Sequence, residues 1–286
     1  MSETRPDLLA RFRIAEITPR RIAEAIWRRA KEMSHAAAWA SQGGVAARNR
    51  VRISRQHGSH VGERCFILGN GPSLRSMDLA PLSHEVTFGL NRIYLMFDRL
   101  PFHPTYYVCI NELVLEQFAH EIRALSMPKF LNWNRRALFG PGDEVTLYLR
   151  LRLGLRDGFA TDLCRPIFSG GTVTYAAIQI AYYMGFREVI LIGVDHAYRD
   201  RGVPNTPAVR QQALDADHFH PDYFPKGSRW QPPDLLRSEI AYAAARRAFE
   251  SDGRRILDAT VAGHCPVFEK VAFESLFASE RDRGSA

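Results

Sequence analysis

The chain has 286 residues, of which 46% are hydrophobic and 24% charged, the balance of an ordinary globular protein. No apolar run reaches the ~20 residues that a membrane-spanning helix needs. The formal charge of +7 lies entirely in residues 1–60, which carry twelve Lys/Arg against five Asp/Glu. Because the rest of the chain is neutral and contains no recognised nucleic-acid motif, we expect no nucleic acid partner.

Residues 1–62 are predicted to form a basic helical segment followed by a linker. Apolar residues recur at helical spacing over 7–40, whereas 41–62 are polar and contain glycines. A basic helix suits an anionic membrane surface or an acidic partner, and a solvated helical face explains the same pattern. The first residues lack an apolar secretory stretch, and no C-x-x-C pair occurs. We therefore expect a cytoplasmic protein, peripheral at the inner membrane if the basic helices dock there.

Residues 63–286 alternate short apolar strands with helices, which predicts a Rossmann-like α/β domain with a mostly parallel sheet and helices on both faces. The expected strands cover residues 64–68, 85–90, 105–110, 128–133, 188–192 and 254–257. The expected helices cover residues 112–125, 173–184, 234–252 and 268–277. Arginines and leucines alternate over 147–155, which fits either an edge strand or an exposed loop.

Polar residues follow directly after several of these strands: Gly69-Asn70-Gly71, Asn91, Asn111 and Asp195-His196. Ligands of parallel sheets bind beyond the carboxyl ends of the strands, so this pattern predicts a binding site. In Gly69-Asn70-Gly71-Pro72-Ser73 the glycines permit close backbone approach, and free N–H groups at the following helix start favour a phosphate. The segment is neither a P-loop nor G-x-G-x-x-G, and a tight β–α turn explains it equally well.

A second glycine-rich segment, Ser169-Gly170-Gly171-Thr172, precedes the helix expected at 173–184. It is a candidate cradle for an anion or a sugar. The alternative is an ordinary N-cap, in which Ser169 or Thr172 bonds to the free N–H groups of the helix.

The long polar loop at 197–233 contains the segment Asp217-His218-Phe219-His220. Long loops inside compact domains are usually functional or disordered, and the aromatic residues of this one favour function. Histidine suits general-base catalysis near neutral pH, so His218 and His220 are candidate bases. Lys226 and Arg229 are candidates for neutralising a phosphate leaving group. Two alternatives stay open: a metal site of Asp195, His196, His218 and His220, and loop histidines without a chemical role.

Taken together, these motifs resemble two related families. The GNGPSL turn, the strand-end asparagines, the segment SGGTVTYAAIQIAYYMGFREVILIGVDHAY and the HFHPDYF loop carry the resemblance, which covers roughly residues 63–277. One is the 6-hydroxymethylpterin diphosphokinase-like domain family, which includes the motility-associated-factor glycosyltransferases. The other is the small bacterial sialyltransferases that use CMP-sialic acid. The resemblance implies a Rossmann-like (GT-A-like) transferase that works without a divalent metal and inverts the sugar.

The resemblance also implies roles for individual residues. Asn70, Asn91 and Asn111 are expected to contact the nucleotide and the sugar. The segment 169–172 lies near the place where the sialyltransferases hold the donor, and Tyr198 corresponds to a tyrosine of their strand-end segment. A histidine base is expected in the loop before the last long helix, with His220 slightly favoured over His218.

We therefore expect transfer of a sugar, a nonulosonic acid from a CMP-linked donor, to a hydroxyl group of a surface glycan. No cofactor is expected besides the nucleotide-sugar co-substrate. The rival functions are an ATP- and Mg²⁺-dependent pterin pyrophosphokinase-like enzyme, a UDP- or GDP-sugar transferase, and a binding module without activity. A homo-oligomer also remains open from the sequence.

Overall fold

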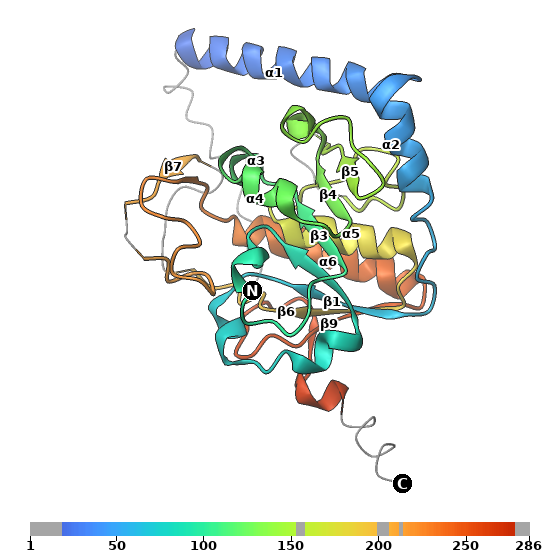
Figure 1. Ribbon diagram of the computed structural model, residues 1–286, viewed down its shortest axis with the longest axis vertical. Coiled ribbons are helices and arrows are strands. Elements are labelled where there is room, and N and C mark those ends of the chain that lie inside the picture. Colours follow the sequence, from blue (N-terminus) through green and yellow to red (C-terminus); the bar gives the residue numbers. More distant parts are fainter. Residues whose placement is uncertain (1–18, 153–157, 199–205, 212–213, 278–286) are drawn as a thin grey trace, which may run out of the picture.

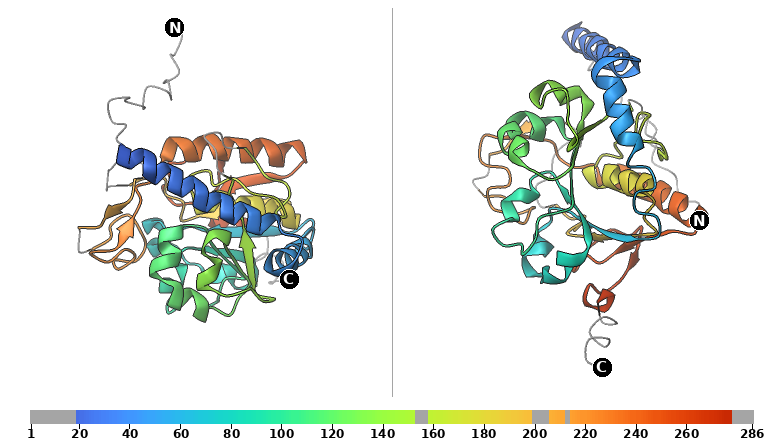
Figure 2. Two further views of the ribbon diagram at one scale, coloured as in Figure 1. Left: turned by 90° about the horizontal axis from the view of Figure 1, so that it is seen from above. Right: turned by 45° about the vertical axis from the view of Figure 1, so that its right-hand side comes forward.

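The computed structural model describes residues 19–152, 158–198, 206–211 and 214–277. Its central sheet has the strand order β10-β9-β6-β1-β2-β3-β4-β5, and all the neighbouring strands pair in parallel. Helices α2, α5 and α6 lie on one face, and α3, α4 and several short 3-10 helices lie on the other (Figure 2). The predicted α/β class, with a mostly parallel sheet covered on both faces, is confirmed.

The strands of this sheet are short. All except β10, whose two residues are exposed, are largely buried, because helices cover both faces of the sheet. They are β1 Arg64–Leu68, β2 Val86–Leu90, β3 Tyr106–Cys109, β4 Lys129–Asn132, β5 Thr146–Leu149, β6 Glu188–Ile192, β9 Arg255–Asp258 and β10 Glu269–Lys270. A separate antiparallel pair, β7 Ala208–Val209 and β8 Arg229–Trp230, lies in the long loop (Figure 1). The stretch 147–155 is predicted as either an edge strand or an exposed loop. Its residues 147–149 belong to the edge strand β5, and residues 153–157 lie outside the described residues.

The helices are α1 Pro19–Ala40, α2 Gly44–Ser54, α3 Glu112–Gln117, α4 Ala119–Ala124, α5 Val173–Met184 and α6 Leu235–Ser251. The short 3-10 helices are η3 Pro72–Ser76, η4 Ala80–His84, η5 Ile93–Met96, η6 Trp133–Leu138 and η7 Glu274–Leu276. Helix α5 ends as predicted, since Gly185 takes the left-handed conformation with φ 93°. The helix expected over 268–277 is instead β10 followed by η7.

The linker predicted over 41–62 is wrong for half of its length, because α2 occupies residues 44–54. Ala46, Asn49 and Ile53 lie on one face of α2 and are buried. The carboxamide of Asn49 pairs with the backbone of Tyr148 on the edge strand β5, donating to its carbonyl at 2.9 Å and accepting from its N–H at 2.8 Å. The side chain of Asn49 thus satisfies backbone groups at the open edge of the sheet. The polar residues of this stretch suggest a linker, but the segment forms a helix packed against the sheet.

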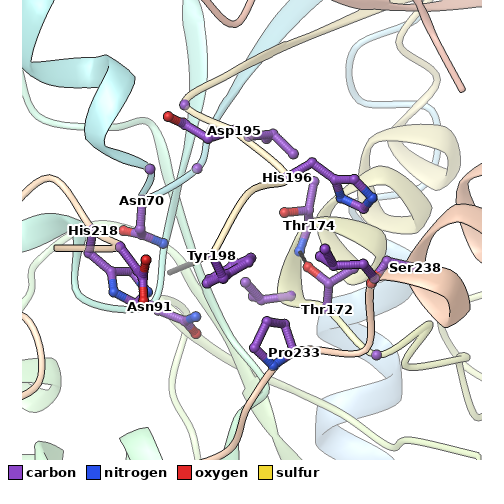
Figure 3. Close-up of a pocket in the computed structure, with 18 of the residues that line it drawn as sticks. Asn70, Asn91, Thr172, Thr174, Asp195, His196, Tyr198, His218, Pro233 and Ser238 are labelled. Atoms are coloured by element: carbon purple, nitrogen blue, oxygen red, sulfur yellow. Dashed lines mark hydrogen bonds between the residues drawn. The ribbon is translucent and has the colours of Figure 1, made fainter. Parts of the chain in front are cut away.

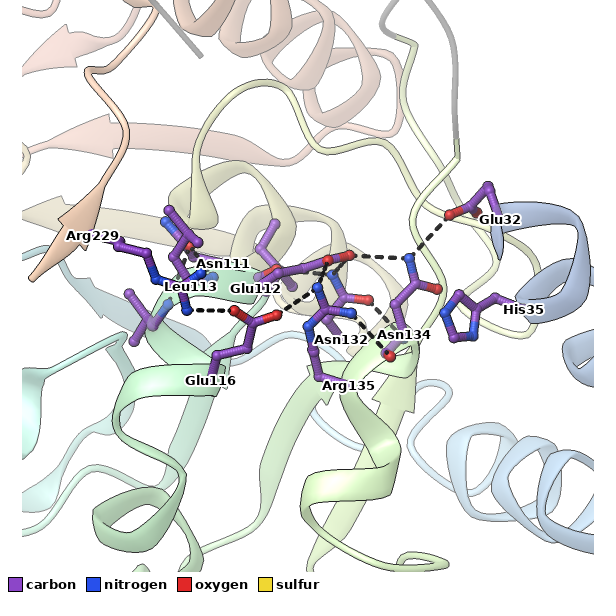
Figure 4. Close-up of polar contacts among 12 residues, drawn as sticks. Glu32, His35, Asn111, Glu112, Leu113, Glu116, Asn132, Asn134, Arg135 and Arg229 are labelled. Carbon is purple, nitrogen blue, oxygen red and sulfur yellow. Dashed lines mark hydrogen bonds and ion pairs between the residues drawn. The ribbon is translucent and has the colours of Figure 1, made fainter. Parts of the chain in front are cut away.

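Helix α1 runs along one edge of the molecule and is tied to the carboxyl ends of β4 and β5 (Figures 1 and 4). Glu32 accepts from Arg150 at 2.7 Å and from Asn134 at 3.1 Å, and Trp133 donates its indole N–H to the carbonyl of His35 at 3.1 Å. Residues 7–18 of the predicted helix lie outside the described residues. The predicted domain boundary at residue 63 stays a prediction. In the part of the chain that the structure describes, no helix is long and apolar enough to cross a membrane.

Candidate functional site

A cavity of about 180 Å³ opens at the carboxyl ends of β6, β1, β2 and β3, which are neighbours in the sheet. The residues that follow these strands all line it: Gly69, Asn70, Gly71, Asn91, Asn111, Asp195 and His196. In Figure 3, Asn70, Asn91 and His218 lie on one side of Tyr198, and Thr172, His196 and Ser238 lie on the other. The structure therefore brings together the polar strand ends from which the sequence predicted a site.

Two of the asparagines have unused hydrogen-bonding capacity. The side-chain oxygens of Asn70 and Asn91 are buried and have no hydrogen-bond partner among the residues that the structure describes. A buried polar atom left unpaired costs about 1–3 kcal/mol, so these amides favour a ligand with hydroxyl or amine groups. Asn111 differs, because its side-chain oxygen caps α3 by accepting from the N–H groups of Leu113 at 2.9 Å and Val114 at 3.3 Å.

The glycines after β1 are required by the neighbouring turn after β6. Gly69 and Gly71 donate their N–H groups to the carbonyls of Ile192 and Gly193, both at 2.8 Å. A Cβ atom on Gly69 would lie 2.2 Å from the carbonyl oxygen of Gly193, and one on Gly71 would lie 1.8 Å from a carboxylate oxygen of Asp195. No side chain fits at either position, because two backbone turns pack directly on each other.

The N–H groups expected to hold a phosphate at Gly69–Ser73 are largely used within the protein. Ser73 donates its N–H to Asp195 at 3.0 Å and its hydroxyl to the same carboxylate at 2.7 Å. The carboxylate therefore caps η3 at the place where a phosphate was expected. Pro72 and Ser73 line a second cavity instead of the first. The turn therefore offers a phosphate few unused N–H groups, and its role in nucleotide binding stays a prediction.

The start of α5 is a stronger candidate for holding an anion. Thr172 is the N-cap, and its hydroxyl oxygen accepts from the N–H of Thr174 at 3.3 Å. Gly171, Thr172 and Thr174 all line the first cavity, so the positive end of a twelve-residue helix faces it. Ser169 and Gly170 do not line it. A Cβ atom on Gly170 would lie 2.4 Å from the ring of Tyr175, so this glycine serves packing.

The loop places one of its histidines on the cavity wall. His218 lines the cavity, stacks on Tyr223 with ring centroids 3.9 Å apart, and bonds through Nδ1 to the carboxylate of Asp215 at 2.9 Å. Burial raises the pKa of Asp215, but the hydrogen bond from His218 and the charges of His218 and Arg210 outweigh it, so this pKa lies below its ordinary value. The ionised carboxylate accepts a hydrogen bond from the Nδ1–H group of His218. Nε2 of His218 is then the basic nitrogen.

Arginines that the sequence did not indicate hold this loop. Arg75 donates to the carbonyls of His218 and Phe219, both at 2.7 Å. Arg92 is buried, donates to the carbonyls of Asp222 at 2.9 Å and of Tyr223, and lies 3.8 Å from the ring centroid of Phe118. Sequence reasoning missed these arginines because every loop carbonyl they bind is more than 100 residues away in the chain.

The remaining candidates of the loop do not line either cavity. His220 accepts the N–H of Asp222 on Nδ1 at 3.1 Å. Lys226 is exposed, and Arg229 pairs with Glu116 at 2.8 Å while 51% of its side chain is exposed (Figure 4). The structure therefore does not bring His220, Lys226 and Arg229 to the site that the other candidates form.

The four candidate metal ligands have separate partners. Asp195 binds Ser73, His196 bonds to Glu239 at 2.9 Å, His218 bonds to Asp215, and His220 lies outside the cavity. Among the described residues, no group of three or more His, Cys, Asp or Glu side chains is placed to hold a metal ion.

Tyr198 stands between the first cavity and a second cavity of about 490 Å³. The two cavities share Asp195, Ala197, Tyr198 and Asp217 as a common wall. Burial, with the nearby carboxylates of Asp217, Asp195 and Asp215, raises the pKa of Tyr198 to about 12. Tyr198 is therefore a hydrogen-bond donor at neutral pH, between two spaces that ligands can enter.

No protein-family model and no curated protein matches the chain. Among solved structures, a MAf glycosyltransferase from Magnetospirillum magneticum AMB-1 is similar, with a TM-score of 0.45 and 17% sequence identity. The match covers 82% of this chain and 39% of that one, so the chain spans well under half the length of the protein that it resembles.

Proposed function

We propose that the chain is a glycosyltransferase that binds its nucleotide-sugar donor in the first cavity and uses His218 as the general base. The observation that carries this proposal is the Asp215–His218 pair on a cavity wall that also presents the unpaired oxygens of Asn70 and Asn91. A carboxylate that orients an imidazole is a common arrangement for removing a proton from a hydroxyl group. The unpaired amides suit the hydroxyl and amine groups of a nucleotide or a sugar.

The proposed reaction is a single displacement without a metal ion. The acceptor oxygen attacks the anomeric carbon, its proton passes to Nε2 of His218, and the bond from that carbon to the phosphate oxygen breaks on the opposite face. The sugar is thereby inverted, and the phosphate leaves with the bonding electrons. The N-terminus of α5 would stabilise this phosphate through its dipole.

The charge of the cavity supports a donor with a single phosphate. The described residues that line it include no lysine or arginine. A nucleoside monophosphate carries less charge than a diphosphate, so it needs less compensation. Together with the sequence resemblance to CMP-sialic acid sialyltransferases, this favours a CMP-linked nonulosonic acid over a UDP- or GDP-sugar. The proposed acceptor is a glycan hydroxyl.

A nucleotide panel tests this proposal: CMP, CDP, UDP, GDP and ATP, each with and without Mg²⁺, in a thermal unfolding assay. Nucleotide at about 100 times its dissociation constant adds about 2.7 kcal/mol to the free energy of unfolding. We expect a shift with CMP or CDP that does not need Mg²⁺. It should be lost in Asn91→Ala and retained in His220→Ala, the matched control outside the cavity.

Other outcomes of the panel would contradict the proposal. A shift with ATP only when Mg²⁺ is present would favour pyrophosphate transfer. A shift with UDP or GDP alone would favour another donor class. If no nucleotide shifted the unfolding temperature, a binding module without transferase activity would be the favoured function.

We also propose that α1 contacts an anionic membrane surface. Trp27 and Met33 are 64% and 68% exposed, and the Lys31 ammonium lies 5.3 Å from the Trp27 ring centroid. Exposed aromatic and basic side chains on one helix suit the lipid interface. Co-sedimentation with phosphatidylglycerol vesicles should exceed that with phosphatidylcholine vesicles and fall in Trp27→Ser. Equal sedimentation with both lipids would reject the contact.

A further inference from the structure

The second cavity has no part in the donor site proposed above, although it directly borders the first. Its own lining comes from η3 and from the turn after β9, including Ser76, Val261 and His264. Its volume of about 490 Å³ falls within the range of small-molecule sites. In a displacement reaction the donor and the acceptor must bind at adjoining sites. The second cavity adjoins the proposed donor site, so its position suits a second substrate.

We propose that the second cavity binds the acceptor, a neutral sugar residue whose nucleophilic hydroxyl extends past Tyr198 towards His218. This inference rests on the proposed glycosyltransferase function. Tyr198 lines both cavities, and its ring centroid lies 6.3 Å from that of His218. A hydroxyl group of a sugar in the second cavity therefore has to pass only the side chain of Tyr198 to reach the proposed base, His218.

The charge of the lining favours a neutral acceptor over an acidic one. Asp195 and Asp217 both contribute to the wall. Each Asp195 oxygen already accepts a hydrogen bond from Ser73, but a carboxylate oxygen has a second lone pair that can accept from a sugar hydroxyl. Arg75 also lines the cavity, and its charge offsets one of the two carboxylates, since its hydrogen bonds to the carbonyls of His218 and Phe219 do not neutralise it. An acceptor with its own carboxylate or phosphate would therefore face a wall whose aspartates outnumber its arginine, and this net negative charge disfavours its binding.

The far side of the cavity provides an apolar surface on a fixed turn. Val261 is 44% exposed and suits the C–H face of a sugar ring. The N–H of His264 donates to the carbonyl of Asp195 at 2.9 Å, and the hydroxyl oxygen of Thr260 accepts from the N–H of Val194 at 3.1 Å. These bonds attach the turn to the segment after β6, so the wall of the cavity is formed before a ligand arrives.

Filling the cavity tests the proposal. Val261→Trp places a large ring in the second cavity, and Val209→Trp is the matched control, since Val209 is 52% exposed and lines neither cavity. Binding of neutral disaccharides such as lactose and N-acetyllactosamine, and of glucuronic acid disaccharides, is measured by titration in the presence of CMP. We expect the full chain to bind a neutral disaccharide, Val261→Trp to weaken this binding at least ~10-fold, and Val209→Trp to leave it unchanged.

Three results would overturn the acceptor site: no disaccharide binding by the unmodified chain, equal binding by Val261→Trp, or binding of the acidic disaccharides alone. If Val261→Trp does not fold, Ser76→Trp enters the same cavity from η3 and must give the same loss. The CMP-induced thermal shift is measured on every variant. Its absence would count against the donor proposal, whereas a disaccharide affinity that depends on Val261 would still support a sugar site.

Discussion

The long loop between β6 and α6 has two groups of ionisable side chains that differ in what surrounds them. The inner group, Arg210, Asp215 and His218, has side chains no more than 11% exposed. The outer group, His220, Lys226 and Arg229, lies outside both cavities. Although His218 and His220 are separated only by Phe219, just one of them has a buried carboxylate partner. Proximity in the sequence therefore does not establish a shared role, whereas a buried partner fixes the geometry that catalysis needs.

Buried aromatic rings create this difference. Phe219 and Tyr223 are 3% and 1% exposed, and the N–H of Phe219 donates to the carbonyl of Asn70 at 2.9 Å. These contacts attach the middle of the loop to the turn after β1. They place the ring of His218 against Tyr223 and leave His220 bonded to its own backbone turn.

The largest effect should distinguish the two histidines. His218→Ala should slow sugar transfer by about 10²–10⁴-fold, because it removes the proposed general base. His220→Ala should slow it less than ~10-fold. Initial rates with a CMP-linked donor measure both, and an unchanged CMP-induced thermal shift shows that the donor site is intact. Comparable losses in the two variants would reject the assignment of the base.

Next in size is the effect of removing the inner arginine. Arg210→Met leaves the buried carboxylate of Asp215 without its guanidinium partner, which lies 3.6 Å away. Breaking a buried ion pair costs about 3–5 kcal/mol, so urea unfolding should show a large loss of stability. The outer-group control, Arg229→Met, should stay within about 0.5 kcal/mol of the unmodified chain. A neutral result for Arg210→Met would mean that the inner group does not stabilise the loop.

A smaller effect should appear in the pH dependence of stability. The folded pKa of Asp215 lies below its unfolded value, so the ionised carboxylate stabilises the fold above the unfolded pKa of about 3.9. This contribution is lost as the pH falls through the lower folded pKa. Urea midpoints of the unmodified chain and of Asp215→Asn should therefore converge as the pH falls below about 4. Asp222→Asn, at an exposed position, should show no such convergence.

The smallest effects are expected for the outer cations. Lys226→Ala and Arg229→Ala should each change stability by less than about 1 kcal/mol, because Lys226 is exposed and the ion pair of the half-exposed Arg229 with Glu116 contributes little. CMP affinity, measured by titration, should change less than ~3-fold, a difference of about 0.7 kcal/mol. If either variant bound CMP ~10-fold or more weakly, Lys226 or Arg229 would again be a candidate for stabilising the leaving phosphate.

The sequence by itself determined the alternation of strands and helices, the extent of α5 and the polar residues at the strand ends. These features are local, and parallel strands necessarily bring their carboxyl ends to one edge of a sheet. Only the tertiary structure decided the partners of those residues. Asp195 caps η3 across 122 positions, Arg75 holds the His218 carbonyl across 143, and Asn49 pairs with Tyr148 across 99. Such pairings depend on how distant segments pack, and the local pattern of residue types does not encode them.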